Sequence, residues 1–232
     1  SRDRGFRGRA EIQASLGLPT LALVPELPAG RKATAPQDYV IEKPRSRYAE
    51  ALREILAAVM LEPGEGQKGR VVLLTSVLPE EGKSTLTLSL SRLAAAEGMR
   101  VLALDVDLRH PSLHRLAGLP PGPGVVELLR GDTPPEDAIR TDPRTDLRIL
   151  ASSGRLSQPT RLLTADRLGR VLDLARERFD LVLVDAAPLA AVADARLLAP
   201  LADGTVLVVR WAHTRRRACG YAVAELGTAG AT

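Results

Sequence analysis

The fold is decided by VVLLTSVLPEEGKSTLTLSL, residues 71–90. This stretch starts as a short apolar run, passes through a turn, and continues as a helix-like segment. The order of strand, loop and helix suits a bound phosphate, because the N–H groups of a tight loop and of the first helical turn point at the same anion. Gly82 allows close approach of the backbone, Lys83 reaches the β- and γ-phosphates, and the Ser84 hydroxyl ligates Mg²⁺. The stretch therefore predicts a site for Mg-ATP.

The loop matches the common phosphate-binding pattern only in its second half. Val77 stands where that pattern has its first glycine. A bare Gly-Lys-Ser is a weak signal, whereas Gly-Lys-Ser-Thr between a buried strand and a helix is specific; the alternative is an ordinary strand–turn–helix. The loop residues that we expect to bind the nucleotide are Ser76, Pro79, Glu81, Gly82, Lys83, Ser84 and Thr85.

Two further apolar runs end in acidic residues. Residues 101–109, VLALDVDLR, place Asp105 and Asp107 two positions apart, so in an extended chain their side chains point the same way. Residues 179–185, FDLVLVD, end in Asp185, where a P-loop protein holds Mg²⁺ or its water. Carboxylates at the end of a buried strand are costly unless they meet a cation. The alternative for Asp105 and Asp107 is that they cap the next helix.

Apolar runs alternate with helix-like segments along the rest of the chain. We expect strands at residues 70–75, 101–104, 147–150, 181–184 and 205–209, and helices at residues 83–97, 124–129, 160–178 and 188–199. Short apolar runs are typical of parallel strands that are buried on both faces. The alternation predicts an α/β fold of the P-loop NTPase type, with a mostly parallel sheet, helices on both faces, and a ligand beyond the carboxyl ends of the strands.

The N-terminal part of the chain follows a different pattern. It predicts a helix at residues 10–16, a strand at 20–24, an exposed linker rich in Pro, Lys and Arg at 26–46, and a helix at 48–61 with a stop at Pro63 and Gly64. We therefore divide the chain into a basic N-terminal segment and linker, residues 1–46, and a P-loop domain, residues 47–232.

The composition is that of an ordinary globular domain, and 232 residues allow one α/β domain with a full core. The net charge of +4, with arginines such as Arg2 and Arg4 near the start, suits an anionic membrane surface or nucleic acid; the alternative is an ordinary solvated surface. Because no aromatics are interleaved with the basic stretches, we expect no nucleic-acid partner. The single Cys219 excludes internal disulfides. The chain begins with serine and has no membrane-spanning apolar run, so we expect a piece of a longer protein.

Three segments together resemble the nucleotide motifs of bacterial tyrosine kinases: the loop at residues 76–85, the run at 105–109 and the strand that ends in Asp185. These kinases are the cytoplasmic domains of polysaccharide co-polymerases. The resemblance covers most of the chain and extends to residues 5–7, 16–19, 107–111, 154–159 and 193–195. It implies a parallel sheet flanked by helices, related to the division-site and plasmid-partition ATPases. Those ATPases carry an extra lysine at the position of Leu78, so the kinase branch is favoured.

The resemblance implies transfer of the γ-phosphoryl group of ATP to protein tyrosines, including those of the chain itself, with Mg²⁺ as cofactor. It also implies control of capsular or exopolysaccharide polymerisation and export, at the cytoplasmic face of the bacterial inner membrane, with a membrane-embedded co-polymerase segment or partner and a possible homo-oligomer. The implied roles are Asp105 as the base for the tyrosine hydroxyl, Lys83 as the second catalytic residue, Ser84, Asp107 and Asp185 as metal ligands, and Arg109 as a further nucleotide contact.

The chain departs from the family pattern in three places. Glu50 and Arg53 match a Glu-x-x-Arg-x-x-Arg helix that is used in ring assembly, but Leu56 replaces the second arginine, so we expect no stable ring from this chain alone. The family often ends in a tyrosine cluster, and this chain has three separate tyrosines. The chain stops at Thr232, where we expect a last core strand, which suggests truncation. The alternative function is an ATP-binding regulatory module of the export machinery without effective kinase activity.

Overall fold

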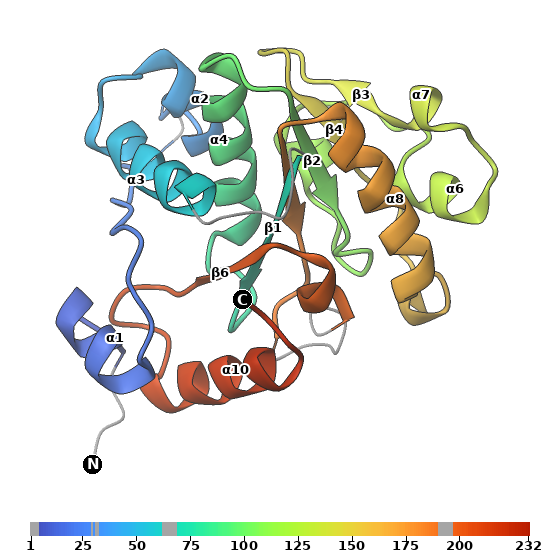
Figure 1. Cartoon of the computed structure of the whole chain (residues 1–232). Coiled ribbons are helices and arrows are strands. Elements are labelled where there is room, and N and C mark those ends of the chain that lie inside the picture. The colour runs from blue at the N-terminus through green and yellow to red at the C-terminus, as the bar shows by residue number, and fades with distance from the viewer. Residues whose placement is uncertain (1–4, 29, 31–32, 62–68, 190–196) are drawn as a thin grey trace.

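Six strands form one sheet in the computed structural model, which describes residues 5–28, 30, 33–61, 69–189 and 197–232 (Figure 1). The strands are β1 (Arg70–Ser76), β2 (Val101–Asp105), β3 (Arg140–Thr141), β4 (Arg148–Leu150), β5 (Leu181–Asp185) and β6 (Gly204–Val208). Their order is β3-β4-β2-β5-β1-β6, and every pair is parallel except β3 with β4. The five strands predicted between residues 70 and 209 are confirmed, and the two-residue edge strand β3 was not predicted.

The register of the central strands brings the predicted site residues to one edge of the sheet. β5 lies between β1 and β2, and Asp105 is paired with Asp185 across β2 and β5. On the other side of β5, Leu74 of β1 is paired with Asp185, two residues before the phosphate loop begins. All three strands are parallel, so their carboxyl ends meet, as sheets of this kind require for a ligand site.

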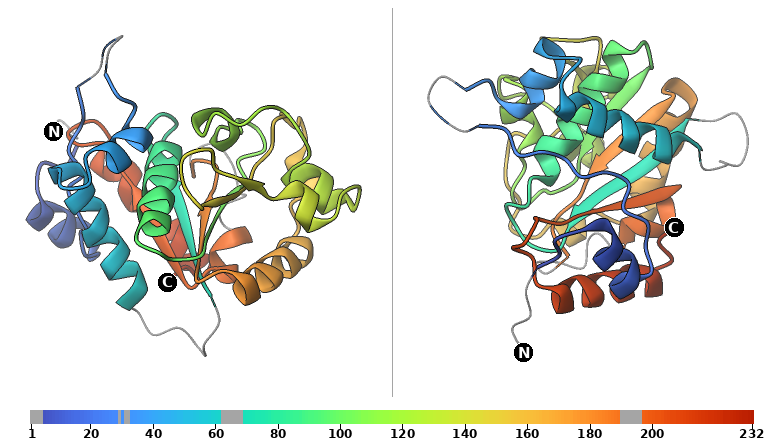
Figure 2. Two further views of the ribbon diagram at one scale, coloured as in Figure 1. Left: turned by 90° about the horizontal axis from the view of Figure 1, so that it is seen from above. Right: turned by 90° about the vertical axis from the view of Figure 1, so that its left-hand side faces the viewer.

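Helices cover both faces of the sheet (Figure 2). The apolar side chains of the strands alternate between two cores, one on each face. Val72 and Leu74 lie in the core under α3 and α4, whereas Val71 and Leu73 lie in the core under α6 and α8. These helices span Arg47–Leu61 (α3), Lys83–Ala96 (α4), Val125–Arg130 (α6) and Ala165–Arg178 (α8). The predicted α/β fold of the P-loop NTPase type, with a mostly parallel sheet and helices on both faces, is confirmed.

The N-terminal segment packs against the rest of the molecule. The predicted strand at residues 20–24 is wrong: the segment is irregular, and Leu21 and Ala22 are partly buried against the core without pairing to any strand. The exposed linker predicted at residues 26–46 is wrong where the chain forms the helix α2 (Pro36–Glu42), which packs on α4 and buries Val40. Pro at the first helical position and Asp in the first turn were the local signals for this helix. The division of the chain at residue 46 stays a prediction.

A buried arginine ties α2 and the β3–β4 hairpin to α4. Arg92 of α4 donates to both carboxylate oxygens of Asp142, at 2.7 and 3.1 Å, and to Asp38 at 2.5 Å. It also donates to the backbone oxygen of Gln37 at 3.1 Å. A buried guanidinium is tolerated only when its donors are used in this way, so α4 is held at its middle by two other parts of the chain.

The remaining helices follow the predictions with some changes. The helix predicted at 160–178 starts later, because Thr164 caps α8 by accepting the N–H of Arg167 and a short turn, Pro159–Arg161, precedes it. The helix predicted at 188–199 lies mostly outside the described residues, as do residues 193–195, Arg2, Arg4 and the stop at Pro63 and Gly64. The helices that were not predicted are α2, α5 (Leu113–Leu116), α7 (Pro135–Ala138) and α10 (Arg216–Thr228).

The predicted helices at 10–16 and 48–61 are confirmed as α1 (Arg9–Leu16) and α3. α1 lies beside α10 (Figures 1 and 2). Phe6, just before α1, is buried with Val77, Cys219 and Ala222 in a third, smaller core. Within the described part of the chain, no helix has both the length and the apolar character that crossing a bilayer requires.

Candidate nucleotide-binding site

The loop after β1 has the backbone shape of an anion-binding loop. Glu80 and Gly82 both adopt the left-handed region, with φ of 63° and 86°. Left-handed residues in such a loop turn successive N–H groups toward a common point, which makes a concave site for an anion. For Glu80, which is not glycine, this conformation costs about 1–2 kcal/mol. α4 begins directly after Gly82, so the unpaired N–H groups of its first turn, at Lys83, Ser84 and Thr85, face the same place.

Two side chains of the loop hold its shape. The Ser76 hydroxyl donates to the backbone oxygen of Leu78 at 2.8 Å, and the Leu78 N–H donates to the Glu81 carboxylate at 2.9 Å. Because these side chains are used inside the loop, Ser76 and Glu81 have mainly their backbone groups to offer a phosphate. Pro79 lies in the same turn, and Arg109 lies in the turn after β2 at the same edge of the sheet.

Lys83 lies between two of the predicted metal ligands. Its Nζ is 3.1 Å from Asp185 Oδ1, 3.3 Å from Asp107 Oδ2, and 3.1 Å from the hydroxyl oxygen of Ser84. Lys83, Asp107 and Asp185 are buried, and Ser84 is half-buried. Burial lowers the pKa of Lys83, but the charges of Asp185 and Asp107 outweigh it and raise the pKa above its ordinary value. The ammonium group is therefore charged at neutral pH, next to the phosphate loop.

Asp105 is fully buried and has a capping role. Its Oδ1 accepts the N–H of Asp107 at 3.2 Å, and its Oδ2 accepts the N–H groups of Ser112 and Leu113, at 2.9 and 3.0 Å, where α5 begins. Asp105 therefore caps the start of α5, and its role toward a nucleotide stays a prediction. Burial and the charge of Asp185 raise the pKa of Asp105 to about 7, while the hydrogen bonds from the backbone oppose the rise. Near neutral pH this carboxyl group gains or loses its proton readily.

Asp185 offers a free oxygen to a metal. Its Oδ2 is buried and has no hydrogen-bond partner among the described residues, and burial raises its pKa although the charge of Lys83 opposes the rise. The oxygen donors of Ser84, Asp107 and Asp185 suit Mg²⁺, which takes one or two carboxylates together with phosphates and waters. Over the described ranges, no three His, Cys, Asp or Glu side chains form a metal site alone. The donor set therefore fits Mg²⁺ that is bound together with a nucleotide.

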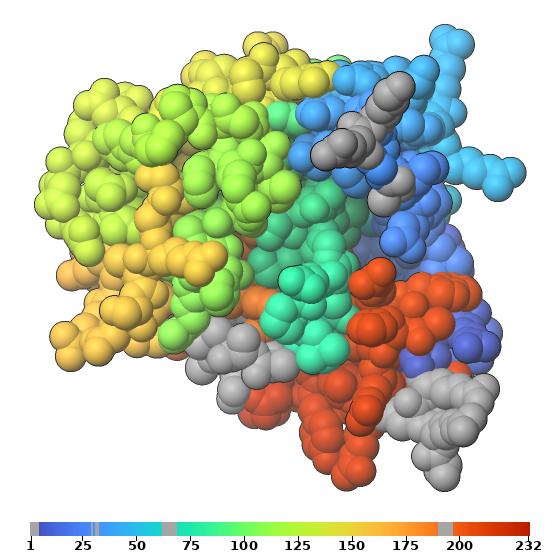
Figure 3. All heavy atoms as spheres, turned by 180° about the vertical axis from the view of Figure 1, so that it is seen from behind, coloured from blue at the N-terminus to red at the C-terminus, as the bar shows by residue number. Residues whose placement is uncertain are grey.

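Sequence reasoning missed the segment that follows β6. Glu81 Oε1 accepts hydrogen bonds from the Thr214 hydroxyl and, at 3.4 Å, from the N–H of Arg210. Figure 3 shows this segment, in orange-red, at the surface beside the green loop that follows β1. The signal that could have located it is topological: a strand next to β1 in a parallel sheet ends at the same edge, but the sequence does not give the strand order.

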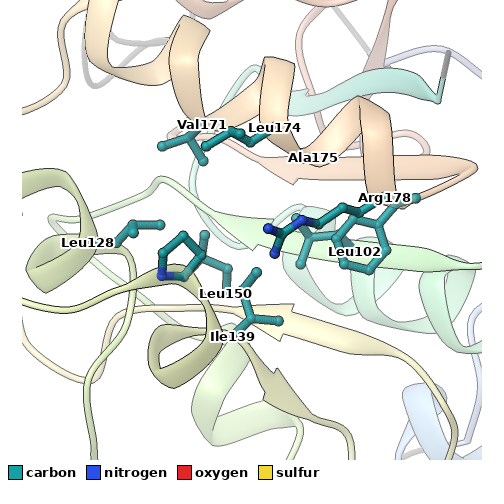
Figure 4. Close-up of a pocket in the computed structure, with 10 residues that line it drawn as sticks. Leu102, Leu128, Ile139, Leu150, Val171, Leu174, Ala175 and Arg178 are labelled. Atoms are coloured by element: carbon teal, nitrogen blue, oxygen red, sulfur yellow. The ribbon is translucent and has the colours of Figure 1, made fainter.

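A small apolar cavity lies away from this edge, between α8 and the region of α6 and α7 (Figure 4). Its lining is almost entirely apolar and includes Leu128, Ile139, Leu150, Val171 and Leu174. Besides the Arg178 side chain, this lining offers no charged group to the phosphates of a nucleotide, so the cavity is a poor fit for a nucleotide.

Comparisons with known proteins agree with this geometry, although no family model matches the chain. The chain is 35% identical over 246 residues to the succinoglycan biosynthesis transport protein ExoP of Rhizobium meliloti strain 1021, a match that covers 93% of this chain and 31% of ExoP. The chain thus spans about a third of that relative's length. It is 31% identical over 186 residues to the tyrosine-protein kinase YwqD of Bacillus subtilis strain 168, which covers 80% of this chain and 78% of YwqD.

Solved structures show the same likeness. The BceF tyrosine kinase domain superposes with a TM-score of 0.83 at 30% identity, over 98% of this chain and 95% of that domain. The septum site-determining protein MinD of Pyrococcus horikoshii OT3, solved with Mg-ADP, superposes with a TM-score of 0.54 at 25% identity, over 61% of this chain and 58% of MinD. Fold, site geometry and identity to YwqD over most of both chains lead to the same conclusion: the chain belongs to the family of bacterial tyrosine kinases.

Proposed function

We propose that the chain binds Mg-ATP at the edge formed by β1, β2 and β5 and transfers the γ-phosphoryl group to protein tyrosines. The observation that carries this proposal is the position of Lys83, whose Nζ contacts Ser84, Asp107 and Asp185 directly after the phosphate loop. Phosphoryl transfer requires positioned phosphates, neutralised charge and an oriented hydroxyl. A lysine, a metal-binding oxygen set and a buried carboxyl group are the side chains that meet these needs.

Each residue of the site has a part in this chemistry. The backbone of the loop and the Lys83 ammonium group bind and orient the phosphates, and Ser84, Asp107 and Asp185 supply oxygens to Mg²⁺. When bound, Mg²⁺ neutralises the charge that develops on the transferred phosphoryl group. Asp105 is the proposed base, because its pKa of about 7 suits acceptance of a tyrosine proton near neutral pH.

The second candidate function is an ATP-binding regulatory module without effective phosphotransfer. One observation favours it: the carboxylate of Asp105 already accepts three backbone N–H groups and is fully buried. A base must reach the proton that it removes. If Asp105 serves only as a cap, nucleotide binding persists and tyrosine phosphorylation does not.

Within this chain, the structure distinguishes the three tyrosines as phosphate acceptors. Tyr48 is 5% exposed and donates to Ser89 at 3.0 Å, and Tyr39 is half-buried against its ring. Tyr221 on α10 is 61% exposed, and its hydroxyl accepts a hydrogen bond from Arg217 at 3.2 Å. A phosphate on Tyr221 would gain a charged partner in Arg217. Tyr221 is therefore the proposed acceptor when a second copy of the chain is the substrate.

Mass spectrometry after incubation with Mg-ATP tests both points. We expect phosphotyrosine on Tyr221 and on an added tyrosine-rich peptide, with Tyr39→Phe as the matched control that keeps both signals. In Tyr221→Phe the signal on the chain should disappear while the peptide is still phosphorylated. ATP binding without phosphotyrosine on either substrate would establish the regulatory-module alternative.

The wider role follows from the relatives, of which the chain spans a part. ExoP is named a succinoglycan biosynthesis transport protein, and we propose that this chain acts in the control of capsular or exopolysaccharide export. Its place would be the cytoplasmic face of the inner membrane, beside a membrane-embedded segment or partner. Replacing the gene by its Lys83→Met form should change the amount or chain length of the exported polysaccharide. An unchanged polysaccharide would remove the basis for this role.

A further inference from the structure

The carboxylate of Glu81 connects the phosphate loop to the segment after β6. Glu81 is buried, and its Oε2 accepts the N–H of Leu78 at 2.9 Å inside the loop. Its Oε1 accepts two hydrogen bonds, a short one from the Thr214 hydroxyl and one of 3.4 Å from the N–H of Arg210. Thr214 is 1% exposed, and its hydroxyl oxygen also accepts the N–H of Arg210 at 3.0 Å. The four residues form a closed set in which the buried carboxylate has donors on both oxygens.

Both segments that this carboxylate joins contain a residue in a costly backbone conformation. Glu80 has φ of 63° in the phosphate loop, and Ala212 has φ of 53° in the segment after β6. Neither is glycine, so each conformation persists only because surrounding contacts hold it. Glu81 directly follows Glu80, and Thr214 lies two residues after Ala212. The contact between them is therefore placed to fix both turns at once.

We propose that Thr214 is a positioning residue for nucleotide binding, acting through Glu81 to hold residues 77–82 in the shape that wraps phosphate. Without the hydroxyl, a buried carboxylate loses a donor that burial prevents water from replacing. The carboxylate then turns toward solvent and releases the N–H of Leu78, and the loop no longer presents its N–H groups to one anion. This inference rests on the nucleotide-binding part of the proposed function, and nothing in the tyrosine chemistry is needed for it.

The first test compares Thr214→Val with Thr214→Ser by calorimetric titration with Mg-ADP. Valine keeps the shape and removes the hydroxyl, whereas serine keeps the hydroxyl. We expect about tenfold weaker binding for Thr214→Val, the value of one lost hydrogen bond to a charged group, and affinity within about twofold of wild type for Thr214→Ser. Thr228→Val is the matched control, because Thr228 is on α10, which follows Thr214 in the chain, and its hydroxyl donates within that helix. Equal affinity of Thr214→Val and wild type would overturn the proposal.

The second test needs no nucleotide. Amide hydrogen exchange measured by NMR reports on the N–H of Leu78, which Glu81 protects. In Thr214→Val the Leu78 amide should exchange at least about tenfold faster, while amides of β5 keep their rates. Unchanged exchange at Leu78 would contradict the role of Thr214 even in a variant that binds Mg-ADP weakly. Wild-type protein that fails to bind Mg-ADP, with Leu78 exchange responding as expected, would instead refute the proposed function alone.

Discussion

Lys83 balances the charge of two buried carboxylates, Asp107 and Asp185, at distances of 3.3 and 3.1 Å. Replacing it by methionine removes a phosphate donor and also leaves both carboxylates without their cation. We expect Lys83→Met to weaken Mg-ADP binding by about 10- to 100-fold and to lower the free energy of unfolding by about 3–5 kcal/mol. Calorimetric titration and urea unfolding measure the two effects. Lys43→Met, at an exposed lysine, is the control. An affinity loss shared by both variants would show that the net charge of the protein, and not the position of Lys83, causes the loss.

Asp105 makes stability depend on pH. Its pKa is about 7 in the folded chain, against 3.8 when unperturbed, so between these values the folded state holds a proton that the unfolded state has lost. The contribution of Asp105 to the free energy of unfolding therefore falls as pH rises from about 4 to 7 and is then level. In Asp105→Asn the fall in the free energy of unfolding that Asp105 causes is absent. Urea unfolding in EDTA at pH 5 and pH 8 should show a wild-type loss larger by at least about 1 kcal/mol than that of the variant. Parallel losses would contradict the raised pKa.

At the scale of elements, α3 shows how a motif position can change its role. In the family resemblance, Leu56 stands where an arginine is used in ring assembly, whereas the structure buries Leu56, 7% exposed, in the core under α3 and α4. Arg53 pairs with Glu50 at 2.5 Å and with Glu97, beyond the end of α4, at 2.7 Å. These charges are thus used within the chain, and Leu56 belongs to the fold. The expectation that the chain forms no stable ring stays a prediction.

Restoring an arginine at this position should destabilise the domain. Leu56→Arg places a charged group in an apolar core, and we expect the free energy of unfolding to fall by about 2–4 kcal/mol. Met60→Arg on the same helix, at a residue that is 37% exposed, should change it by less than about 0.5 kcal/mol. Urea unfolding of both variants is the measurement. A Leu56→Arg protein as stable as Met60→Arg would mean that α3 packs differently.

The elements also show what the sequence could predict. The sequence could predict β1, β2 and β5 because strands buried on both faces are short apolar runs. It could predict the loop at Gly82 because binding a phosphate requires a glycine, a lysine and a hydroxyl next to one another in the chain. The apolar run at residues 20–24 was misread, because periodicity does not say whether a strand lies beside it. The helix α2 was missed because it packs on α4 and accepts hydrogen bonds from Arg92, and both are far away in sequence. For the same reason Thr214 could not be placed before the neighbour of β1 was known.

At the scale of the whole molecule, the sheet order joins three separate sequence segments into one site. β5 lies between β1 and β2, so the phosphate loop, Asp105, Asp107 and Asp185 meet at one edge although more than 100 positions separate the first from the last. The helices on both faces pack against the strands that form that edge, and β6 leads into the segment that contacts the loop. The central claim is therefore spatial: Mg²⁺ and the nucleotide bind where these three strands end.

A crystal structure of the chain with Mg-ADP tests that claim most directly. The account predicts the diphosphate against the loop at residues 77–82, the Lys83 ammonium group within hydrogen-bond distance of it, and Mg²⁺ about 2.1 Å from the Ser84 hydroxyl oxygen. Asp107 or Asp185 should ligate Mg²⁺ directly or through one water. Nucleotide bound elsewhere on the molecule, or Mg²⁺ remote from Ser84 and both aspartates, would contradict the account.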